Sequence, residues 1–346
     1  MRSALVGTGA IARQHLAPLS RLAGADLVAV CDLSRVSAEF AAERYGARAW
    51  FTDHREMLAA CRPEVVHITT PAPSHYQLAC DALEAGAHVI VEKPITVDDA
   101  ELERLLERAE RGGLALVEDY NYLFNPPVEQ LLEAVASGGL GEVVHTEVTF
   151  CSDVLGAGSP FTDPDVRHPA ADLPGGAIGD FVTHLASLAH AVAGSHREVK
   201  VAWTRDGGAP ATDMVALVEA ERGTATLRFS ARARPQAFTV RVSGSELSAT
   251  ASLFGERLTF QREATWRRPL QMARRGVEAG IDGALSSLAG PWSRLSGGPG
   301  PYVGIGRLIE RTYDALREGS PPPVTPDQVR AVNRLRVDIL AQEGPA

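Results

Sequence analysis

The feature that most constrains this chain is a glycine-rich turn between an apolar run and a helical pattern. Residues 3–7 read Ser-Ala-Leu-Val-Gly, and residues 7–12 have the pattern G-x-G-x-x-A. The first glycine of such a pattern permits a tight turn, the second lets a pyrophosphate approach the backbone, and the small alanine lets helix and strand pack closely. Free N–H groups at the start of the helix favour an anion. The turn therefore predicts a dinucleotide site, whose contacts we expect to be Gly7, Thr8, Gly9, Ala10 and Ile11.

An acidic residue follows the second expected strand. Asp32 comes directly after the apolar run 26–31, ~20–25 residues beyond the glycines, where a carboxylate can accept hydrogen bonds from the ribose hydroxyls. This favours NAD. Ser34 and Arg35 come next and are able to hold a 2′-phosphate, so NADP stays an alternative, although a solvated residue at a helix start is the simpler interpretation of Arg35.

Strand-like and helical segments continue to alternate along the first third of the chain. Residues 65–70, 88–91 and 114–117 fit strands, and residues 74–85 and 98–111 fit helices. This alternation predicts a parallel sheet with right-handed crossovers, whose ligands lie at the carboxyl ends of the strands. The candidate cofactor contacts near these ends are Thr70, Pro71, His75, Glu92, Lys93 and Asn121. Thr70 and His75, like His15, also fit as polar groups that are satisfied within the fold.

Length, charge and cysteine usage exclude several classes of protein. A chain of 346 residues fits two domains. The net charge of -9, without runs of Lys or Arg, argues against a nucleic-acid partner. The first residues pass directly into the glycine turn, which leaves no room for a signal peptide, and no stretch reaches the ~20 apolar residues of a membrane span. The spacing of the cysteines suits reduced thiols better than disulfides or a metal site. We expect a cytoplasmic protein without a bound metal.

Four motifs, in this order along the chain, resemble the Gfo/Idh/MocA family, which includes glucose–fructose oxidoreductase and inositol dehydrogenase. They are GTGAIARQH at 7–15, TTPAPSHYQLACDALEAGAHVIVEKP at 69–94, NYLFNP at 121–126 and PGGAIGDFVTH at 174–184. The EKP motif, with a glycine fingerprint before it and GG-x-x-x-D-x-x-x-H after it, is a specific combination. The resemblance implies an NAD(P)-binding Rossmann domain over residues 1–120.

The resemblance also implies a second, α+β domain over residues 121–346, with an open and mostly antiparallel sheet that binds the substrate. The sequence agrees, because strand-like stretches follow one another without long helices between them. These stretches are 143–150, 198–204, 214–219, 224–230 and 238–243. We expect a final helix over about 326–342 to pack back on the first domain. The open sheet is expected to form a dimer or tetramer.

Three residues are the candidate catalytic set. Lys93 follows an apolar strand and precedes Pro94, which directs its ammonium to the strand end. If residues 180–192 are helical, Asp180 and His184 share one face, and the carboxylate raises the basicity of the imidazole. The resemblance implies that His184 removes the alcohol proton as hydride moves to the nicotinamide, with Lys93 and Asp180 in support. Without the family context, a solvent-facing pair is the simpler interpretation of Asp180 and His184.

Departures from the family pattern leave the substrate open. Leu123 stands where an arginine is common, and Ser187 where many relatives have an aspartate. Residues 264–300 contain a basic amphipathic stretch suited to capping the pocket or to self-association, less to a membrane surface. His168 lies in a loop that is a weaker candidate to cover the substrate.

Three functions remain compatible with the sequence. The first is an NAD(P)-dependent oxidoreductase that acts on a secondary alcohol or ketone of a sugar, glycoside or cyclitol. The second uses the same cofactor for transient oxidation without net redox change, as in epimerisation, elimination or bond cleavage. The third is a non-catalytic NAD-binding regulator, against which Lys93, Asp180 and His184 argue.

Overall fold

The computed structural model describes residues 1–156, 159, 161–162, 168, 174–205, 211–262 and 302–343. The chain forms two compact units, each assembled from three segments. The first unit consists of Met1–Asn121, Pro160–Thr183 and Ile305–Arg334. The second consists of Tyr122–Ser159, His184–Gly304 and Leu335–Ala346.

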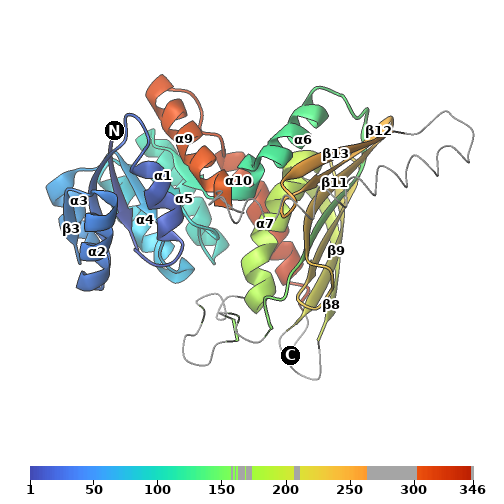
Figure 1. Ribbon diagram of the computed structural model, residues 1–346, viewed down its shortest axis with the longest axis horizontal. Helices are drawn as coiled ribbons and strands as arrows, with labels where there is room; N and C mark the ends of the chain where they lie inside the picture. Colours follow the sequence, from blue (N-terminus) through green and yellow to red (C-terminus); the bar gives the residue numbers. More distant parts are fainter. Residues whose placement is uncertain are drawn as a thin grey trace, which may run out of the picture. The chain divides into compact units, whose positions relative to one another are not determined.

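The first unit contains a six-stranded sheet with the order β3-β2-β1-β4-β5-β6, in which every pairing is parallel. The strands are β1 (Arg2–Val6), β2 (Asp26–Cys31), β3 (Ala49–Phe51), β4 (Val65–Ile68), β5 (His88–Val91) and β6 (Leu116–Glu118). The connecting helices are α1 (Ala12–Leu19), α2 (Arg35–Tyr45), α3 (His54–Cys61), η1 (Ala72–Ser74), α4 (His75–Glu84) and α5 (Asp99–Gly112). This strand order is that of the dinucleotide-binding fold, so the predicted parallel Rossmann sheet is confirmed (Figure 1).

Helix α5 illustrates how the sequence forms these elements. Its buried residues are Leu102, Leu105, Leu106 and Ala109, which recur at helical spacing and make one apolar face. The Asp98 carboxylate caps the first turn by accepting from the Glu101 N–H. Gly113 ends the helix in the left-handed conformation, which glycine adopts without steric cost. The N-cap, the apolar face and the C-terminal glycine therefore together determine where α5 begins and ends.

Residues near the end of the chain also belong to the first unit. They form α9 (Val303–Glu318) and the first part of α10 (Pro326–Leu340). The Tyr313 hydroxyl donates to the Ser3 hydroxyl over 2.7 Å, and the Asn333 amide donates to Asp99 over 2.7 Å. The segment is thereby joined to β1 and α5. The sequence pattern predicted α10 but not α9.

The second unit contains a seven-stranded sheet with the order β13-β12-β11-β7-β10-β9-β8. The strands are β7 (Val143–Cys151), β8 (His196–Thr204), β9 (Asp213–Ala220), β10 (Thr224–Ser230), β11 (Ala237–Gly244), β12 (Leu247–Ser252) and β13 (Arg257–Arg262). Only β7 and β10 pair in parallel. The sheet is therefore mostly antiparallel, as predicted, although β12 and β13 were not foreseen.

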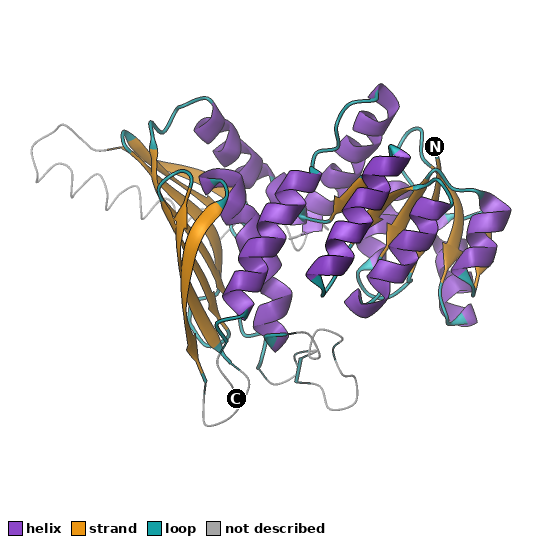
Figure 2. Ribbon diagram, turned by 180° about the vertical axis from the view of Figure 1, so that it is seen from behind, coloured by secondary structure: helices purple, strands orange, loops and turns teal. Residues whose placement is uncertain are grey.

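In the part of the chain that the structure describes, helices lie against one face of this second sheet, as Figure 2 shows. Among them α6 (Pro126–Ala136) contacts β12 and β13. The rings of Phe229 and Phe238 pack against that of Phe150, with centroid separations of 5.6 and 5.2 Å, respectively. None of the helices in the described ranges combines the length and apolar character that a membrane span requires.

Candidate active site

The glycine turn has the geometry that the sequence predicts. Gly7 has a φ of +91°, and a Cβ at this position would lie 2.6 Å from Thr70 Cγ2. By contrast, a Cβ on Gly9 would meet nothing within 4 Å among the described residues. The residue at the N-cap of α1 is Ile11, whose apolar side chain does not cap the helix. Gly7 is thus required for packing, while the open space at Gly9 and the uncapped helix start suit a bound diphosphate.

Asp32 is bound to the glycine turn. Its Oδ2 accepts from the Thr8 main-chain N–H at 2.7 Å and from the Thr8 hydroxyl at 2.9 Å. Its Oδ1 accepts from the Ser34 N–H at 2.8 Å. The end of β2 is therefore tied to the start of α1, and the Asp32 carboxylate lies at the edge where the fold binds a ribose.

Thr70 and His75 make contacts within the fold. The Thr70 hydroxyl accepts from the Ser74 hydroxyl at 2.7 Å. The two ring nitrogens of His75 lie 2.9 Å from the Pro94 carbonyl oxygen and 2.7 Å from the Thr70 carbonyl oxygen. Burial lowers the pKa of His75. These contacts favour the interpretation of His75 as a residue that joins the segments after β4 and β5, and Pro71 begins the exposed turn between β4 and α4.

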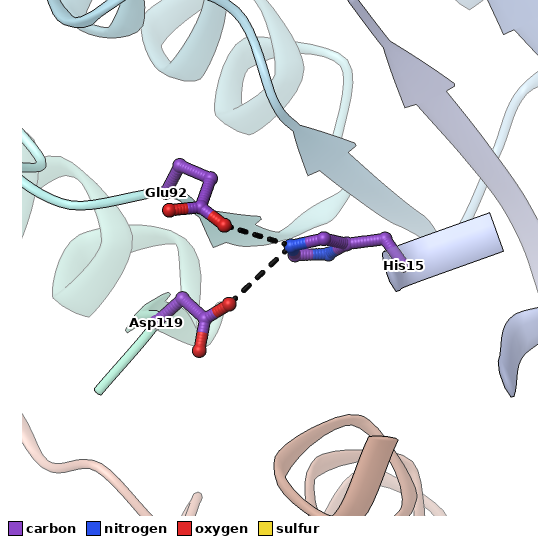
Figure 3. A group of neighbouring side chains, drawn as sticks. All are labelled: His15, Glu92 and Asp119. Carbon is purple, nitrogen blue, oxygen red and sulfur yellow. Dashed lines mark hydrogen bonds and ion pairs between the residues drawn. The ribbon is translucent and has the colours of Figure 1, made fainter. Parts of the chain in front are cut away.

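Glu92 belongs to a buried cluster with His15 and Asp119, which Figure 3 shows. His15 Nε2 lies 3.1 Å from Glu92 Oε1 and 3.3 Å from Asp119 Oδ2. The sequence pattern placed Glu92 among the cofactor contacts, but its carboxylate is directed to His15. Asp119 was missed, because its only signal was its place after a strand. Asn121 begins the short helix η2 (Asn121–Phe124) and is buried.

Lys93 and Asp180 form an ion pair in the first unit. Lys93 Nζ lies 2.5 Å from Asp180 Oδ1 and donates a second hydrogen bond of 3.0 Å to the Asp180 carbonyl oxygen. Their side chains are 12% and 17% exposed, so little solvent screens the pair. Residues 87 positions apart in the sequence are thus brought into direct contact.

His184 lies on the same helix as Asp180. Helix α7 runs from Gly176 to Ala193, which confirms the helix predicted for 180–192. His184 follows Asp180 by four residues and belongs to the second unit, where its buried ring packs edge to face against Tyr122 at 4.6 Å. The Ser187 hydroxyl, at the position where many relatives have an aspartate, donates to the His184 carbonyl oxygen at 3.0 Å.

His168 lies within electrostatic range of the ion pair. Burial lowers its pKa, Asp180 opposes this effect and Lys93 adds to it. The ring stacks on Phe161 at 4.0 Å. The loop position of His168 made it a weak candidate in the sequence, because spacing along the chain does not reveal its closeness to Lys93. The basic stretch at 264–300 lies outside the described residues.

A Rossmann sheet with an open glycine turn, an acid at the end of β2 and a Lys–Asp pair after β5 defines a dinucleotide-binding α/β protein. Residues 1–120 match the model of an oxidoreductase family with an NAD-binding Rossmann fold, and residues 128–250 match that of the GFO/IDH/MocA C-terminal domain. The two matches together span most of the chain. The chain belongs to the Gfo/Idh/MocA family.

Individual relatives agree with the family assignment. The chain is 28% identical to the D-apiose dehydrogenase of Paraburkholderia graminis over 340 residues, which span 92% of this chain and 88% of that protein. It is 35% identical to the D-glucoside 3-dehydrogenase of Escherichia coli over 147 residues, and the match spans 42% of each chain. The fold resembles the WlbA dehydrogenase of Bordetella pertussis, solved with NADH and UDP-GlcNAcA, with a TM-score of 0.76, 18% identity and coverage of 99% and 94%.

Proposed function

We propose that this protein is an NAD-dependent dehydrogenase that oxidises a secondary hydroxyl group of a sugar, glycoside or cyclitol, or reduces the corresponding ketone. The observation that carries the proposal is the short ion pair between Lys93 and Asp180, together with His184 four residues further along α7. Buried acidic and basic side chains beside a dinucleotide-binding fold are typical of hydride-transfer enzymes, whereas a non-catalytic regulator does not require them.

The chain's own residues have distinct roles in this proposal. Gly7, Gly9 and the start of α1 bind the diphosphate, and Asp32 accepts hydrogen bonds from the adenosine ribose, which favours NAD over NADP. Bound NAD supplies a carbon that accepts hydride. His184 accepts the proton of the substrate hydroxyl, and Lys93, directed by Asp180, donates a hydrogen bond to the substrate oxygen.

The names of the relatives support the proposed substrate class. The D-apiose and D-glucoside dehydrogenases act on sugars and glycosides by their names, and the WlbA structure contains a nucleotide sugar. Leu123 and Ser187 replace an arginine and an aspartate of the family pattern. We therefore propose a glycosidic substrate rather than free inositol, because Leu123 has no polar group and the Ser187 hydroxyl already donates to the His184 carbonyl oxygen, so fewer hydrogen-bonding groups are left for further hydroxyls.

A cofactor-reduction assay tests this function. Purified protein with NAD is offered a panel of sugars, glycosides and cyclitols, and absorbance at 340 nm is followed together with product analysis. We expect stoichiometric NADH and an oxidised sugar for at least one substrate, and Lys93→Ala should lower the rate ~10²–10⁴-fold. Lys200→Ala, on β8 and exposed, is the matched control and should keep the rate. Turnover without net NADH, or a Lys93→Ala variant of normal rate, contradicts the proposal.

Two further parts of the sequence-based expectation stay proposals. We retain the division into a cofactor domain over residues 1–120 and a substrate domain over 121–346. We also retain a homo-oligomer formed through the face of the second sheet that no described helix covers. Val215 and Leu217 on β9 point to that face and are 41% and 54% exposed.

A further inference from the structure

The cluster of His15, Glu92 and Asp119 is not used by the mechanism above, although it lies among the segments that carry that mechanism. His15 comes from α1, the helix that begins at the glycine turn. Glu92 directly precedes Lys93, and Asp119 lies two residues before Asn121. One buried imidazole thus joins three separate segments of the cofactor edge (Figure 3).

We propose that His15 is a positioning residue which, as a buried imidazolium ion, holds the ends of β5 and β6 against the helix that follows the glycine turn. Through Glu92 it fixes the segment that directs Lys93, and through Asp119 it fixes the segment that leads into Asn121. A proton, rather than a metal ion, is the cation that balances the carboxylates.

The directions of the surrounding hydrogen bonds support the charge on His15. The Ser3 hydroxyl donates to the Met1 carbonyl oxygen, and the Tyr313 hydroxyl donates to the Ser3 oxygen at 2.7 Å. Tyr313 has then used its only proton, so its oxygen accepts from His67 Nε2, which lies 3.0 Å away.

The hydrogen-bond chain continues from His67 to His15. With its proton on Nε2, neutral His67 has a lone pair on Nδ1. His15 Nδ1 lies 3.3 Å from this atom and therefore donates to it. His15 Nε2 faces the Glu92 and Asp119 carboxylates, which require a donor as well. Both ring nitrogens of His15 carry a proton, which is the definition of the imidazolium form.

The electrostatics agree with this proton count. His15 is faced by Glu92 from the end of β5, by Asp119 from the end of β6 and by His67 from β4, while Lys93 and His75 lie near Glu92. Burial alone would lower the pKa of His15, but hydrogen bonds and charge attraction from both carboxylates raise it to about 9. Burial and the charge of His15 lower the pKa of His67, which keeps that ring neutral.

The two carboxylates differ in pKa, and this difference sets the net charge of the cluster at each pH. Burial and the neighbouring Glu92 raise the pKa of Asp119 to about 6, whereas His15 and Lys93 help to lower that of Glu92. At pH values below about 6 the cluster therefore holds one imidazolium, one carboxylate and one carboxylic acid. A cluster without net charge is far less costly to bury than one in which both carboxylates are ionised beside a neutral histidine.

Histidine NMR tests the charge state without use of activity. In ¹⁵N-labelled protein we expect His15, one of the ten histidines, to keep both ring protons at pH 8, where an ordinary imidazole is neutral. That signal should disappear in His15→Gln and persist in His54→Gln. His54 is the matched control because it also binds a carboxylate, Asp81, at 2.7 Å, away from the cofactor edge. A wild-type spectrum in which the His15 ring is neutral at pH 8 overturns the proposal.

Metal analysis and kinetics complete the test. A stoichiometric metal ion that is lost in His15→Gln, or His15-dependent binding of added Zn²⁺ or Mn²⁺, overturns the assignment of a proton. Because a displaced Lys93 impairs catalysis, His15→Gln should lower kcat up to ~10²-fold with a smaller change in NAD affinity. The double variant with Glu92→Gln should be no worse than the worse single variant, since the two residues act as one unit. Additive losses overturn the positioning role.

This kinetic arm rests on the proposed function, but the NMR arm does not. A wild-type protein without dehydrogenase turnover contradicts the proposed function and leaves the imidazolium measurable. A neutral His15 in an active dehydrogenase contradicts this inference alone.

Discussion

The Lys93 ammonium is directed by two oxygens of one residue, the side chain and the carbonyl of Asp180. Replacement of the carboxylate by an amide keeps the shape and removes the charge. We expect Asp180→Asn to lower kcat by ~10–10²-fold, because a charge-assisted hydrogen bond is worth about 1.5–3 kcal/mol. Steady-state kinetics with NAD and substrate measure this effect. An Asp180→Asn variant with wild-type kcat would mean that Lys93 is directed by other groups.

His184 is expected to be the general base. His184→Ala should lower the rate by ~10²–10⁴-fold, the usual scale for acid–base catalysis, while NAD binding stays close to that of the wild type. His190 lies on the same helix, and its pKa is lowered by burial. His190→Ala is thus a control for loss of a half-buried imidazole from α7. Equal losses in both variants would assign the effect to helix packing.

Asp32 has two tasks, one toward the glycine turn and one toward the cofactor. Asp32→Ala should weaken NAD binding by ~10–10²-fold, because hydrogen bonds to a charged group are lost, and NADP binding by less. Titration calorimetry measures both affinities. Thr8→Val removes only the 2.9 Å hydrogen bond between the Thr8 hydroxyl and Asp32. This variant therefore distinguishes the contribution of Asp32 to the glycine turn from its contribution to ribose binding. Equal weakening of NAD and NADP would show that Asp32 does not bind the ribose.

At the scale of elements, the sequence is least informative where apolar residues do not mark the buried face, although it also missed α9, whose buried residues do repeat at helical spacing. Helix α2 buries only three alanines, while Leu33, Val36 and Phe40 near or on it are exposed. Strand β12 buries Ala249 and Ala251 between serines and threonines. In both elements the apolar pattern does not mark the buried face, so tertiary packing decides the structure.

The residues of the candidate site also fall into those that local sequence patterns predict and those that they do not. The glycine turn, Lys93, Asp180 and His184 follow from local motifs and a helical spacing of four. The partner of Glu92 does not, because His15 lies 77 residues before it in the sequence. Contacts between strand ends depend on strand order and register, which periodicity along one segment does not contain.

The turn between β1 and α1 offers a matched pair of substitutions. Gly7→Ala places a Cβ 2.6 Å from Thr70 Cγ2 at a φ of +91°, whereas Gly46→Ala meets nothing within 4 Å at a φ of +74°. Both changes strain the backbone by about 1 kcal/mol or more. Only Gly7→Ala adds a steric clash. The free energy of unfolding of the Gly7→Ala variant should therefore fall by about 2 kcal/mol more than that of Gly46→Ala, and NAD binding should be lost. Chemical denaturation measures the difference, and equal destabilisation would contradict the packing role of Gly7.

At the scale of the whole molecule, the buried cluster makes stability depend on pH. The folded pKa of His15, about 9, exceeds its ordinary value of 6.5, so folding binds a proton more tightly. The stabilisation is therefore complete below pH 6.5 and is lost as pH rises toward 9; it amounts to about 3 kcal/mol at most. Denaturation between pH 6 and 9 should show this decline in the wild type and in His54→Gln but not in His15→Gln. A wild-type stability that is flat over this range would exclude a raised pKa.

The second sheet is the part of the molecule where association should be decided. Among the described residues, helices lie against one face only, and Val215 and Leu217 on β9 are exposed apolar side chains that alternate with its buried residues. Exposed aliphatic side chains on a regular sheet favour a self-complementary interface between copies of the same chain. Leu217→Glu would bury a carboxylate in such an interface, which is costly. We expect this variant to shift the mass measured by light scattering toward the monomer, while Val36→Glu, an equally polar change at an exposed residue of α2, leaves it unchanged. A wild-type protein that is monomeric at micromolar concentration would contradict association through this face, and a Leu217→Glu oligomer of wild-type mass would place the interface elsewhere.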